Sequence, residues 1–419
     1  MKKTNLPVFS FFLLIVFVTS CSKKEVTATT SITNKIVDTI AAVKVIPMAV
    51  IDPFAFTKLA FGNNIDPANL LNYANQTKPT YVLKDNTGAN TITNPKATLG
   101  RVLFYDKNLS TTNTISCSSC HKQNFAFSDT ALVSNGVEGG LTARHSIRLI
   151  NTRFAKETKF FWNERAASLE IQTTMPIQDH LEMGYSGLNG RGNIASLLSK
   201  LSKINYYKEL FKFVYGDTVV TEPRLQETLA QFVRSIQSFD SKYDVGRAQA
   251  RNDNDPFPNF TSIENTGKNL YMTPPVFNTS GLRITGGLGC NGCHNAPEFD
   301  IDPNSRNNGI IGIIGSNDIE LNDTRAPSLR DLTKTDGTIN SRMMHTGAFN
   351  SLRAVLGHYN SIPSNPRNTN LDPRLKPNNN GQQLNLTPDE TDAVIAFIKT
   401  LSGTNVYLDK KWGNPFLIP

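Results

Sequence analysis

The sequence predicts a mainly α-helical protein in which two similar domains follow one another along the chain. Apolar residues recur at helical spacing in several segments, namely 99–105, 195–215, 223–239 and 386–401. Alternating strand patterns are scarce. The motif Cys-x-x-Cys-His occurs twice, at residues 117–121 and 290–294, which indicates a duplicated unit.

The N-terminus predicts export and a lipid anchor. Two lysines precede a short apolar run that ends at Thr19, and Cys21 follows two residues later. This order is typical of a bacterial lipoprotein signal, whose cysteine is lipidated and becomes the mature N-terminus. We therefore predict a signal peptide at 1–20 and lipidation of Cys21. The alternative is an ordinary signal peptide with an incidental cysteine.

The rest of the chain divides by composition. Residues 21–80 are predicted to form a tether and N-terminal extension, residues 81–255 the first domain and residues 256–419 the second. The beginning of the tether is rich in Thr, Ser, Val and Ala without periodicity. The run 251–260, with Asn, Asp and two prolines, is typical of an interdomain linker.

Two helices have especially clear signals. The segment 386–401 begins with Thr387-Pro388-Asp389-Glu390, a helix start signal. The segment 223–239 has one apolar face, formed by Leu225, Leu229, Phe232, Val233 and Ile236.

The cysteines indicate covalently bound haem. Four of the five belong to the two motifs, which consist of Cys117, Cys120, His121 and of Cys290, Cys293, His294. Disulfide scaffolds, zinc ribbons and thioredoxin-like sites also use Cys-x-x-Cys, but none of them requires an adjacent histidine. In c-type cytochromes two thioethers hold the porphyrin and that histidine binds the iron. The sequence therefore predicts two covalently bound haem c groups.

Further residues recur in the same order in both halves. The first half carries Arg144, Arg148-Leu149, Trp162 and Ser168-Leu169, and the second carries Arg325, Ser328-Leu329, His345 and Ser351-Leu352. The Ser-Leu pair follows Trp162 and His345 at the same distance. A duplicated domain explains this order and allows positions to be compared between the halves.

An ordered set of motifs runs from about Leu99 to Leu401. They are L-G-R-x-L-F-Y-D (99–106), I-S-C-S-S-C-H (115–121), A-F-S-D (126–129), F-F-W-N-E-R (160–165), E-M-G (182–184), L-G-C-N-G-C-H (288–294), R-A-P-S-L-R (325–330) and H-T-G-A-F-x-S-L (345–352). Together they resemble the bacterial dihaem cytochrome c peroxidase superfamily, which includes MauG. The resemblance implies two cytochrome-c-like domains in tandem, haems that face the domain interface, and two-electron reduction of hydrogen peroxide.

By this resemblance the N-terminal haem is the peroxide site. The family places Gln, Pro and Glu at fixed distances beyond an interface tryptophan, and counting from Trp162 gives Gln172, Pro176 and Glu182. Glu182 is then the expected acid/base, with a pKa raised above an apolar haem face. Trp162 would relay electrons between the haems. The alternatives are a structural loop glutamate and an ordinary core tryptophan.

Many family members close the resting peroxide haem with a distal histidine. The corresponding stretch here, 135–140, contains none, so we expect a haem that is open without prior reduction. His145 lies nearby, and its use as a movable ligand is the alternative. It occupies the place of an asparagine ligand of the family's interhaem calcium site, which argues against that ion. His180 is expected to be a surface or capping histidine.

The C-terminal haem needs a sixth ligand to act as an electron store. In the family this is Met in peroxidases and Tyr in MauG, fourteen residues after the histidine of the H-x-G motif, and counting from His345 gives Tyr359. A phenolate would lower the haem potential. The rival ligands are His358, Met343 and Met344, which have suitable chemistry at the wrong offset.

These expectations describe a peroxidase in the periplasm or cell envelope, anchored to a membrane. Electrons from a small redox protein, a cytochrome c or a cupredoxin, would enter at the C-terminal haem and pass Trp162. A second hypothesis, favoured by Tyr359, is a MauG-like enzyme that oxidises a protein or other substrate through high-valent iron. A third is a dihaem electron carrier, against which Gln172 and Glu182 argue. The formal charge of +8 is spread without a basic, aromatic-rich run, so no nucleic-acid partner is expected.

Overall fold

The fold is mainly helical, as predicted. The computed structural model describes residues 52–417, so the predicted signal peptide and Cys21 lie outside the described residues. The helices are α2 (Ala55–Phe61), α3 (Asn94–Tyr105), α4 (Cys117–Cys120), α5 (Leu169–Gln178), α6 (Ile194–Leu201), α7 (Asn205–Tyr215), α8 (Glu222–Ser235), α9 (Lys242–Arg247), α10 (Ser262–Met272), α11 (Leu352–Asn360), α12 (Pro388–Lys399) and α13 (Asn405–Leu408). Two short hairpins pair β1 (Pro275–Phe277) with β2 (Arg283–Gly286) and β3 (His294–Asn295) with β4 (Asp300–Ile301). Within the described part, no helix is long and apolar enough to cross a membrane.

The predicted helices begin at side-chain caps. In α12 the Thr387 side chain accepts from the backbone N–H of Glu390, and the Glu390 side chain accepts from that of Thr387. In α3 the Thr93 side chain accepts from Lys96 N–H, and a proline occupies the first turn. The helix predictions at 99–105, 195–215, 223–239 and 386–401 are confirmed, with 195–215 divided into α6 and α7.

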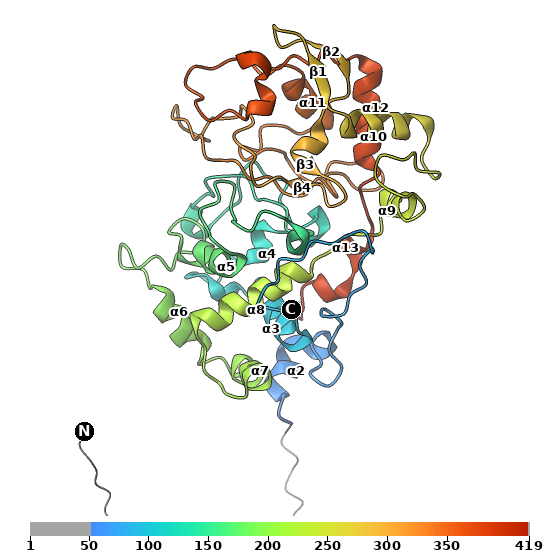
Figure 1. Ribbon diagram of the computed structural model, residues 1–419. Coiled ribbons are helices and arrows are strands. Elements are labelled where there is room, and N and C mark those ends of the chain that lie inside the picture. Colours follow the sequence, from blue (N-terminus) through green and yellow to red (C-terminus); the bar gives the residue numbers. More distant parts are fainter. Residues whose placement is uncertain (1–51, 418–419) are drawn as a thin grey trace, which may run out of the picture. The chain divides into compact units, whose positions relative to one another are not determined.

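Each half has its own hydrophobic core built on one close helix pair. In the first core α3 packs against α8, and a Cβ atom at Gly100 would lie 2.0 Å from the Thr228 carbonyl oxygen. In the second core α10 packs against α12, and a Cβ atom at Gly267 would lie 1.8 Å from the Ala393 carbonyl oxygen. Glycine therefore permits both contacts. Figure 1 shows the second pair in gold and red and the first in blue and yellow-green.

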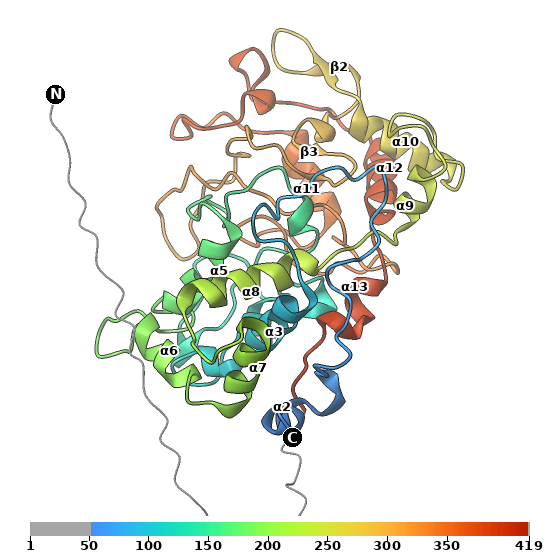
Figure 2. The same cartoon turned by 60° about the horizontal axis from the view of Figure 1, so that its bottom comes forward.

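Both ends of the described chain pack on the first core. Tyr73 from the predicted extension is buried there and its hydroxyl donates to the Lys411 carbonyl. Trp412 is buried in the same cluster and its Nε1 donates to the Ser235 carbonyl. Figures 1 and 2 both place red α13 with the helices of the first half, where it contacts the turn Gln123–Phe125. The tail of the predicted second domain, 256–419, thus packs on the first core, where Trp412 contributes a large buried aromatic side chain.

The predicted linker also contributes to a core. Residues 251–260 form neither helix nor strand. Phe257 and Phe260 from this run are nevertheless buried in the second cluster, where their rings lie 5.0 Å apart. The connection between the halves is thus fixed by packing.

The duplication extends to local backbone geometry. Antiparallel bridges join Phe160 to Ala166 and, in the second half, Met343 to Phe349. The residue after each bridge start has a left-handed backbone, with φ of 70° at Phe161 and 69° at Met344. Each bridged loop leads to a capping serine, Ser168 before α5 and Ser351 before α11. The two loops that carry Trp162 and His345 therefore have the same fold.

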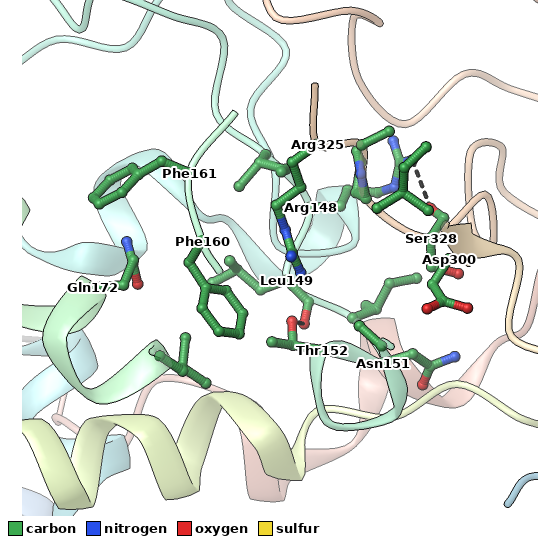
Figure 3. A pocket seen from close by; sticks show the side chains of 17 residues that line it. Arg148, Leu149, Asn151, Thr152, Phe160, Phe161, Gln172, Asp300, Arg325 and Ser328 are labelled. Atoms are coloured by element: carbon green, nitrogen blue, oxygen red, sulfur yellow. Dashed lines mark hydrogen bonds between the residues drawn. The ribbon is translucent and has the colours of Figure 1, made fainter. Parts of the chain in front are cut away.

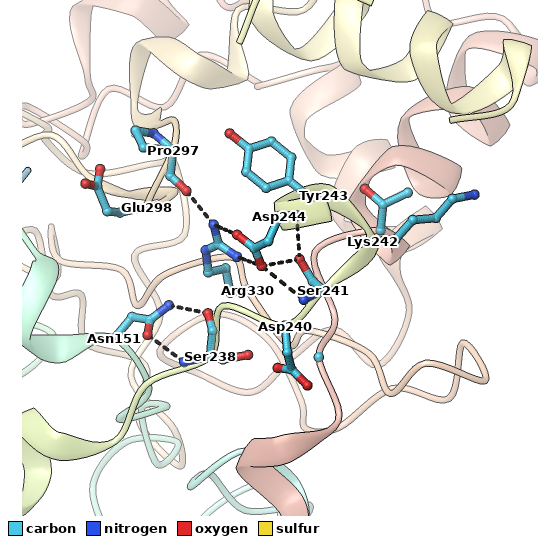
Figure 4. Close-up of polar contacts among 12 residues, drawn as sticks. Asn151, Ser238, Asp240, Ser241, Lys242, Tyr243, Asp244, Pro297, Glu298 and Arg330 are labelled. Atoms are coloured by element: carbon cyan, nitrogen blue, oxygen red, sulfur yellow. Dashed lines mark hydrogen bonds and ion pairs between the residues drawn. The ribbon is translucent and has the colours of Figure 1, made fainter. Parts of the chain in front are cut away.

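A buried ion pair joins α9 to the second half (Figure 4). Arg330 is fully buried and donates through both terminal nitrogens to the Asp244 carboxylate, at 2.9 Å each. The Tyr81 hydroxyl and the Ser241 hydroxyl also donate to this carboxylate. The pair is therefore well satisfied by hydrogen bonds.

We expect Asp244→Asn to lower the free energy of unfolding by about 3–5 kcal/mol, because Arg330 would keep its buried charge without a counter-charge. Urea denaturation followed by circular dichroism measures this loss. The matched control is Arg353→Met, which breaks the exposed pair with Asp392 and should cost less than about 1 kcal/mol. Equal losses in the two variants would contradict the expectation.

Candidate functional site

The first Cys-x-x-Cys-His motif forms the short helix α4. A reciprocal cap between Ser116 and Ser119 starts it, and His121 ends it. The Nδ1–H of His121 donates to the Phe127 carbonyl at 3.1 Å, which leaves Nε2 free to bind a metal. Cys117 and Cys120 are free thiols, and burial raises their pKa values to about 12 and about 11. The motif thus offers two neutral thiols and one oriented imidazole.

Glu182 lies close to this motif. Its negative charge acts on the thiols of both Cys117 and Cys120. Burial, together with the charge of Asp179, raises the pKa of Glu182 to about 7, while Arg165 opposes the shift. A carboxyl group with this pKa can give and take a proton near neutral pH.

Helix α5 carries the other two residues predicted for this side. Pro176 lies in its last turn and Gln172 in its middle. Gln172 lines a small cavity of about 50 Å³ together with Phe160 and Phe161, and Figure 3 shows its amide facing these rings. The structure therefore places Gln172 and Pro176 on the helix that leads into the Glu182 loop.

Two glycines lock the loop 136–140 against the Glu182 loop. A Cβ atom at Gly136 or Gly140 would lie 1.8 or 2.3 Å from the Leu181 carbonyl oxygen. The buried Val137 donates its N–H to the Glu182 carbonyl at 3.0 Å. The loop 136–140 therefore presents its backbone to the Glu182 loop. It contains no histidine side chain that could bind a haem iron at the first motif.

Trp162 lies at the interface between the halves and is held by both of them. Its Nε1 donates to the His145 carbonyl at 2.7 Å, and its own carbonyl accepts from the N–H of Thr324 and of Arg325. The rings of Trp162 and His345, which are equivalent in the duplication, lie 6.2 Å apart. The tryptophan is thus fixed between the two motif-bearing halves.

The second motif opens onto a larger cavity. This cavity has a volume of about 510 Å³ and is lined by Cys290, Cys293 and His294, with Trp162 at the interface side. Its size and mostly apolar lining are typical of cofactor pockets. The lining, two thiols and a buried imidazole fit a covalently attached haem. Burial, then the charges of Arg374 and Arg148, lowers the pKa of His294 to about 4, so the imidazole is neutral as a metal ligand must be.

Tyr359 and Met344 both reach the large cavity. The Tyr359 hydroxyl accepts from the Asn308 amide at 3.1 Å, and the same amide nitrogen lies 3.3 Å from the Met344 sulfur. His358 instead donates from Nε2 to the Asn308 carbonyl at 2.9 Å. Its ring is therefore engaged. Met343 also lines the cavity as part of the second core, while Asn308 brings Tyr359 and Met344 to one place. Burial raises the pKa of Tyr359 well above its ordinary value.

His145 faces the same large cavity. Its side chain is 3% exposed, Nδ1 donates to the Ala131 carbonyl at 3.0 Å, and Nε2 has no partner among the described residues. The sequence hypothesis made it a movable ligand for the first motif. The structure places it among the residues around the second motif.

The Asp323 carboxylate at the interface is already engaged by an arginine, so it is not a vacant ligand for a cation. Calcium takes six to eight oxygen ligands. The buried carboxylate of Asp323 is held by Arg144 Nε at 2.9 and 3.0 Å, and it lies 3.4 Å from His345 Nε2. Between residues 52 and 417, no group of three or more His, Cys, Asp or Glu side chains has the geometry of a metal site.

Sequence reasoning missed two residues at this site. Asn308 stands in a polar loop without periodicity, so only the fold shows that it lies beside Tyr359 and Met344. Arg148 could have been found from the sequence. It stands in the repeated order of residues where the second half has the uncharged Ser328, and this difference between the halves was the signal.

The chain is similar to a described protein family and to named relatives. Residues 94–252 match a family described as di-haem cytochrome c peroxidase. The methylamine utilization protein MauG of Methylophilus methylotrophus is 28% identical over 75% of this chain and 84% of its own. Cytochrome c551 peroxidase of Nitrosomonas europaea is 26% identical over 73% and 80%.

Solved structures show the same fold. A MauG-like protein associated with microbial copper homeostasis is 25% identical, with a TM-score of 0.61, over 81% of this chain and 99% of its own. The diheme peroxidase BthA of Burkholderia thailandensis, at 19% identity and a TM-score of 0.58, covers 84% and 97%.

Proposed function

Because the chain belongs to the dihaem cytochrome c peroxidase and MauG superfamily of haem oxidoreductases, we propose that it reduces hydrogen peroxide to water with electrons from a small redox protein. The observation that carries this proposal is the half-buried carboxyl group of Glu182, whose pKa is raised to about 7 beside the first Cys-x-x-Cys-His motif. Peroxide reduction needs such a group, since protons must move as the O–O bond breaks.

The residues that would hold the two haems are Cys117, Cys120 and His121 in the first half and Cys290, Cys293 and His294 in the second. Haem, when bound there, would pass electrons from the redox partner to peroxide. The chain orients His121 through its hydrogen bond to the Phe127 carbonyl. Glu182 takes the proton from one peroxide oxygen and delivers it to the other, and Gln172 orients peroxide by hydrogen bonding.

Trp162 is proposed as the electron relay. It is 9% exposed and bound through its indole to one half and through its carbonyl to the other. A side chain held in this way keeps a constant position between two redox groups. Electrons from a cytochrome c or cupredoxin would enter at the C-terminal haem.

Export and lipidation at Cys21 would place the enzyme at a membrane of the cell envelope.

The second candidate function is MauG-like oxidation of a protein or other substrate. Tyr359 favours it, because its hydroxyl reaches the cavity of the second motif from the position where MauG carries a tyrosine ligand. The non-enzymatic alternative, a dihaem electron carrier, gives no role to a titratable group beside the first motif.

The oxidised protein is expected to contain one high-spin haem and to bind cyanide without prior reduction, because the loop 136–140 offers no ligand. It should then consume hydrogen peroxide with a reduced small cytochrome c as donor. EPR spectra and stopped-flow absorbance test these expectations. A resting spectrum with only low-spin haem that becomes high-spin in His145→Ala would identify His145 as the ligand. If no reductant supports peroxide turnover, the hypothesis of a non-enzymatic dihaem electron carrier would be favoured instead.

Tyr359→Phe is expected to change the EPR and optical spectra of the C-terminal haem and to raise its reduction potential, because a phenolate donor is lost. Met344→Leu is the matched control, since it alters the other group beside Asn308. It should leave the spectra as in the wild type. A spectral change in Met344→Leu alone would assign the ligand to the methionine.

A further inference from the structure

Arg148 is a buried cation without a carboxylate partner in the described part of the chain. Its side chain is 6% exposed and donates to the Ser328 carbonyl at 3.0 Å and the Ser341 hydroxyl at 3.3 Å, while Nε has no partner. Burial lowers the pKa of Arg148 to about 10, so it remains charged at neutral pH. The charge of the buried Asp331 acts on Arg148 without a hydrogen bond or ion pair between them, so the guanidinium still has room for an anion in direct contact.

The positive charge of Arg148 has no equivalent at the corresponding place in the second half. In the repeated order of residues, Arg148-Leu149 begins four residues after Arg144 and Ser328-Leu329 begins three residues after Arg325, so the second half has a small hydroxyl near the place where the first has a guanidinium. Arg148 reaches across the interface to the backbone of its own counterpart. The asymmetry suggests a role that the shared fold does not require.

Arg148 faces the cavity of the second motif. It lines the 510 Å³ cavity together with Cys290, Cys293 and His294, and also the small cavity between the halves shown in Figure 3. Its charge acts on the His294 imidazole, where it contributes to the lowered pKa. Arg374 acts there too, but it is already paired with Asp372 at 2.7 Å. Arg148 is thus a positive charge beside the second motif that forms no ion pair within the described residues.

We propose that Arg148 binds a propionate carboxylate of the haem attached to Cys290 and Cys293 and thereby raises the reduction potential of that haem. The proposal rests on the proposed function in that it assumes a haem at this motif. A haem carries two carboxylates, and a guanidinium is the side chain best suited to bind them. Neutralising a carboxylate near the iron removes negative charge that favours Fe(III) over Fe(II). Arg148 would oppose the lowering of the potential by a phenolate ligand.

The test measures the midpoint potentials of both haems by spectroelectrochemistry in three variants of the full dihaem protein. Arg148→Gln removes the charge, Arg148→Lys keeps it, and Ser341→Ala removes one hydrogen bond of Arg148 without changing any charge. We expect the potential of the C-terminal haem to fall in Arg148→Gln and to stay near the wild-type value in the other two. Pyridine haemochrome spectra establish that two haems are bound.

An unchanged potential in Arg148→Gln with both haems present would overturn the proposal. So would equal shifts in all three variants, which would indicate a structural role. If Arg148→Gln does not accumulate with two haems, Arg148→Lys decides, because a clear fall of its potential contradicts a role based on charge. These potentials do not depend on turnover, so an inactive protein would refute the proposed peroxidase function and leave this test intact.

Discussion

Replacing Cys290 by serine is expected to remove one of two covalently bound haems, and Cys117→Ser should remove the other. Each motif has only two thiols with which to form thioethers, and the remaining cysteine and histidine cannot fix the porphyrin in the same way. Acid-acetone extraction followed by pyridine haemochrome spectra should give two covalent haems in the wild type and one in each variant. The loss is therefore complete at the altered motif.

The fifth cysteine supplies the matched control. Cys21→Ser should keep both haems and lose only the membrane anchor, since Cys21 belongs to neither motif. One haem or none in the wild-type protein would refute the proposed cofactor content. The separate losses would also show which optical and EPR signals belong to which half, and the tests of Tyr359 and Arg148 need that assignment.

Glu182→Gln is expected to lower peroxide turnover by roughly two orders of magnitude or more, with both haem spectra nearly unchanged. Glutamine keeps the shape and hydrogen bonding of the side chain but cannot exchange a proton. The wild-type rate should also show a titration near the pKa of about 7 that burial and Asp179 give to Glu182, because the carboxyl is protonated below this pH and ionised above it. The variant should lack this titration.

Glu138→Gln is the control for the Glu182 experiment. Glu138 lies on the neighbouring loop, is exposed, and pairs with Arg191 at 2.6 Å. Its replacement should leave turnover within a few-fold of the wild type. If Glu182→Gln keeps near-wild-type turnover from pH 5 to pH 8, the carboxylate is structural and the peroxide mechanism loses its acid/base.

The helices were predictable because their signals are local. A cap at Thr387 and an apolar stripe along 386–401 involve neighbouring residues only, and the structure reproduces both. The two Cys-x-x-Cys-His motifs are local for the same reason, since thioether attachment and iron ligation use five consecutive residues. The repeated order around Trp162 and His345 likewise predicted two loops of one fold, which the bridges and left-handed residues display.

The sequence by itself thus predicted the helices, the duplication, the resemblance to one family and the candidate haem-binding residues. Tertiary structure alone decided what surrounds them: the pKa of Glu182, the cavity that His145 faces, the joint position of Tyr359 and Met344 beside Asn308, and the return of Trp412 to the first core. The physical reason is the separation along the chain of the residues that interact. Burial and charge at a site come from side chains far apart in the chain, and one sequence without its fold does not reveal which of them meet.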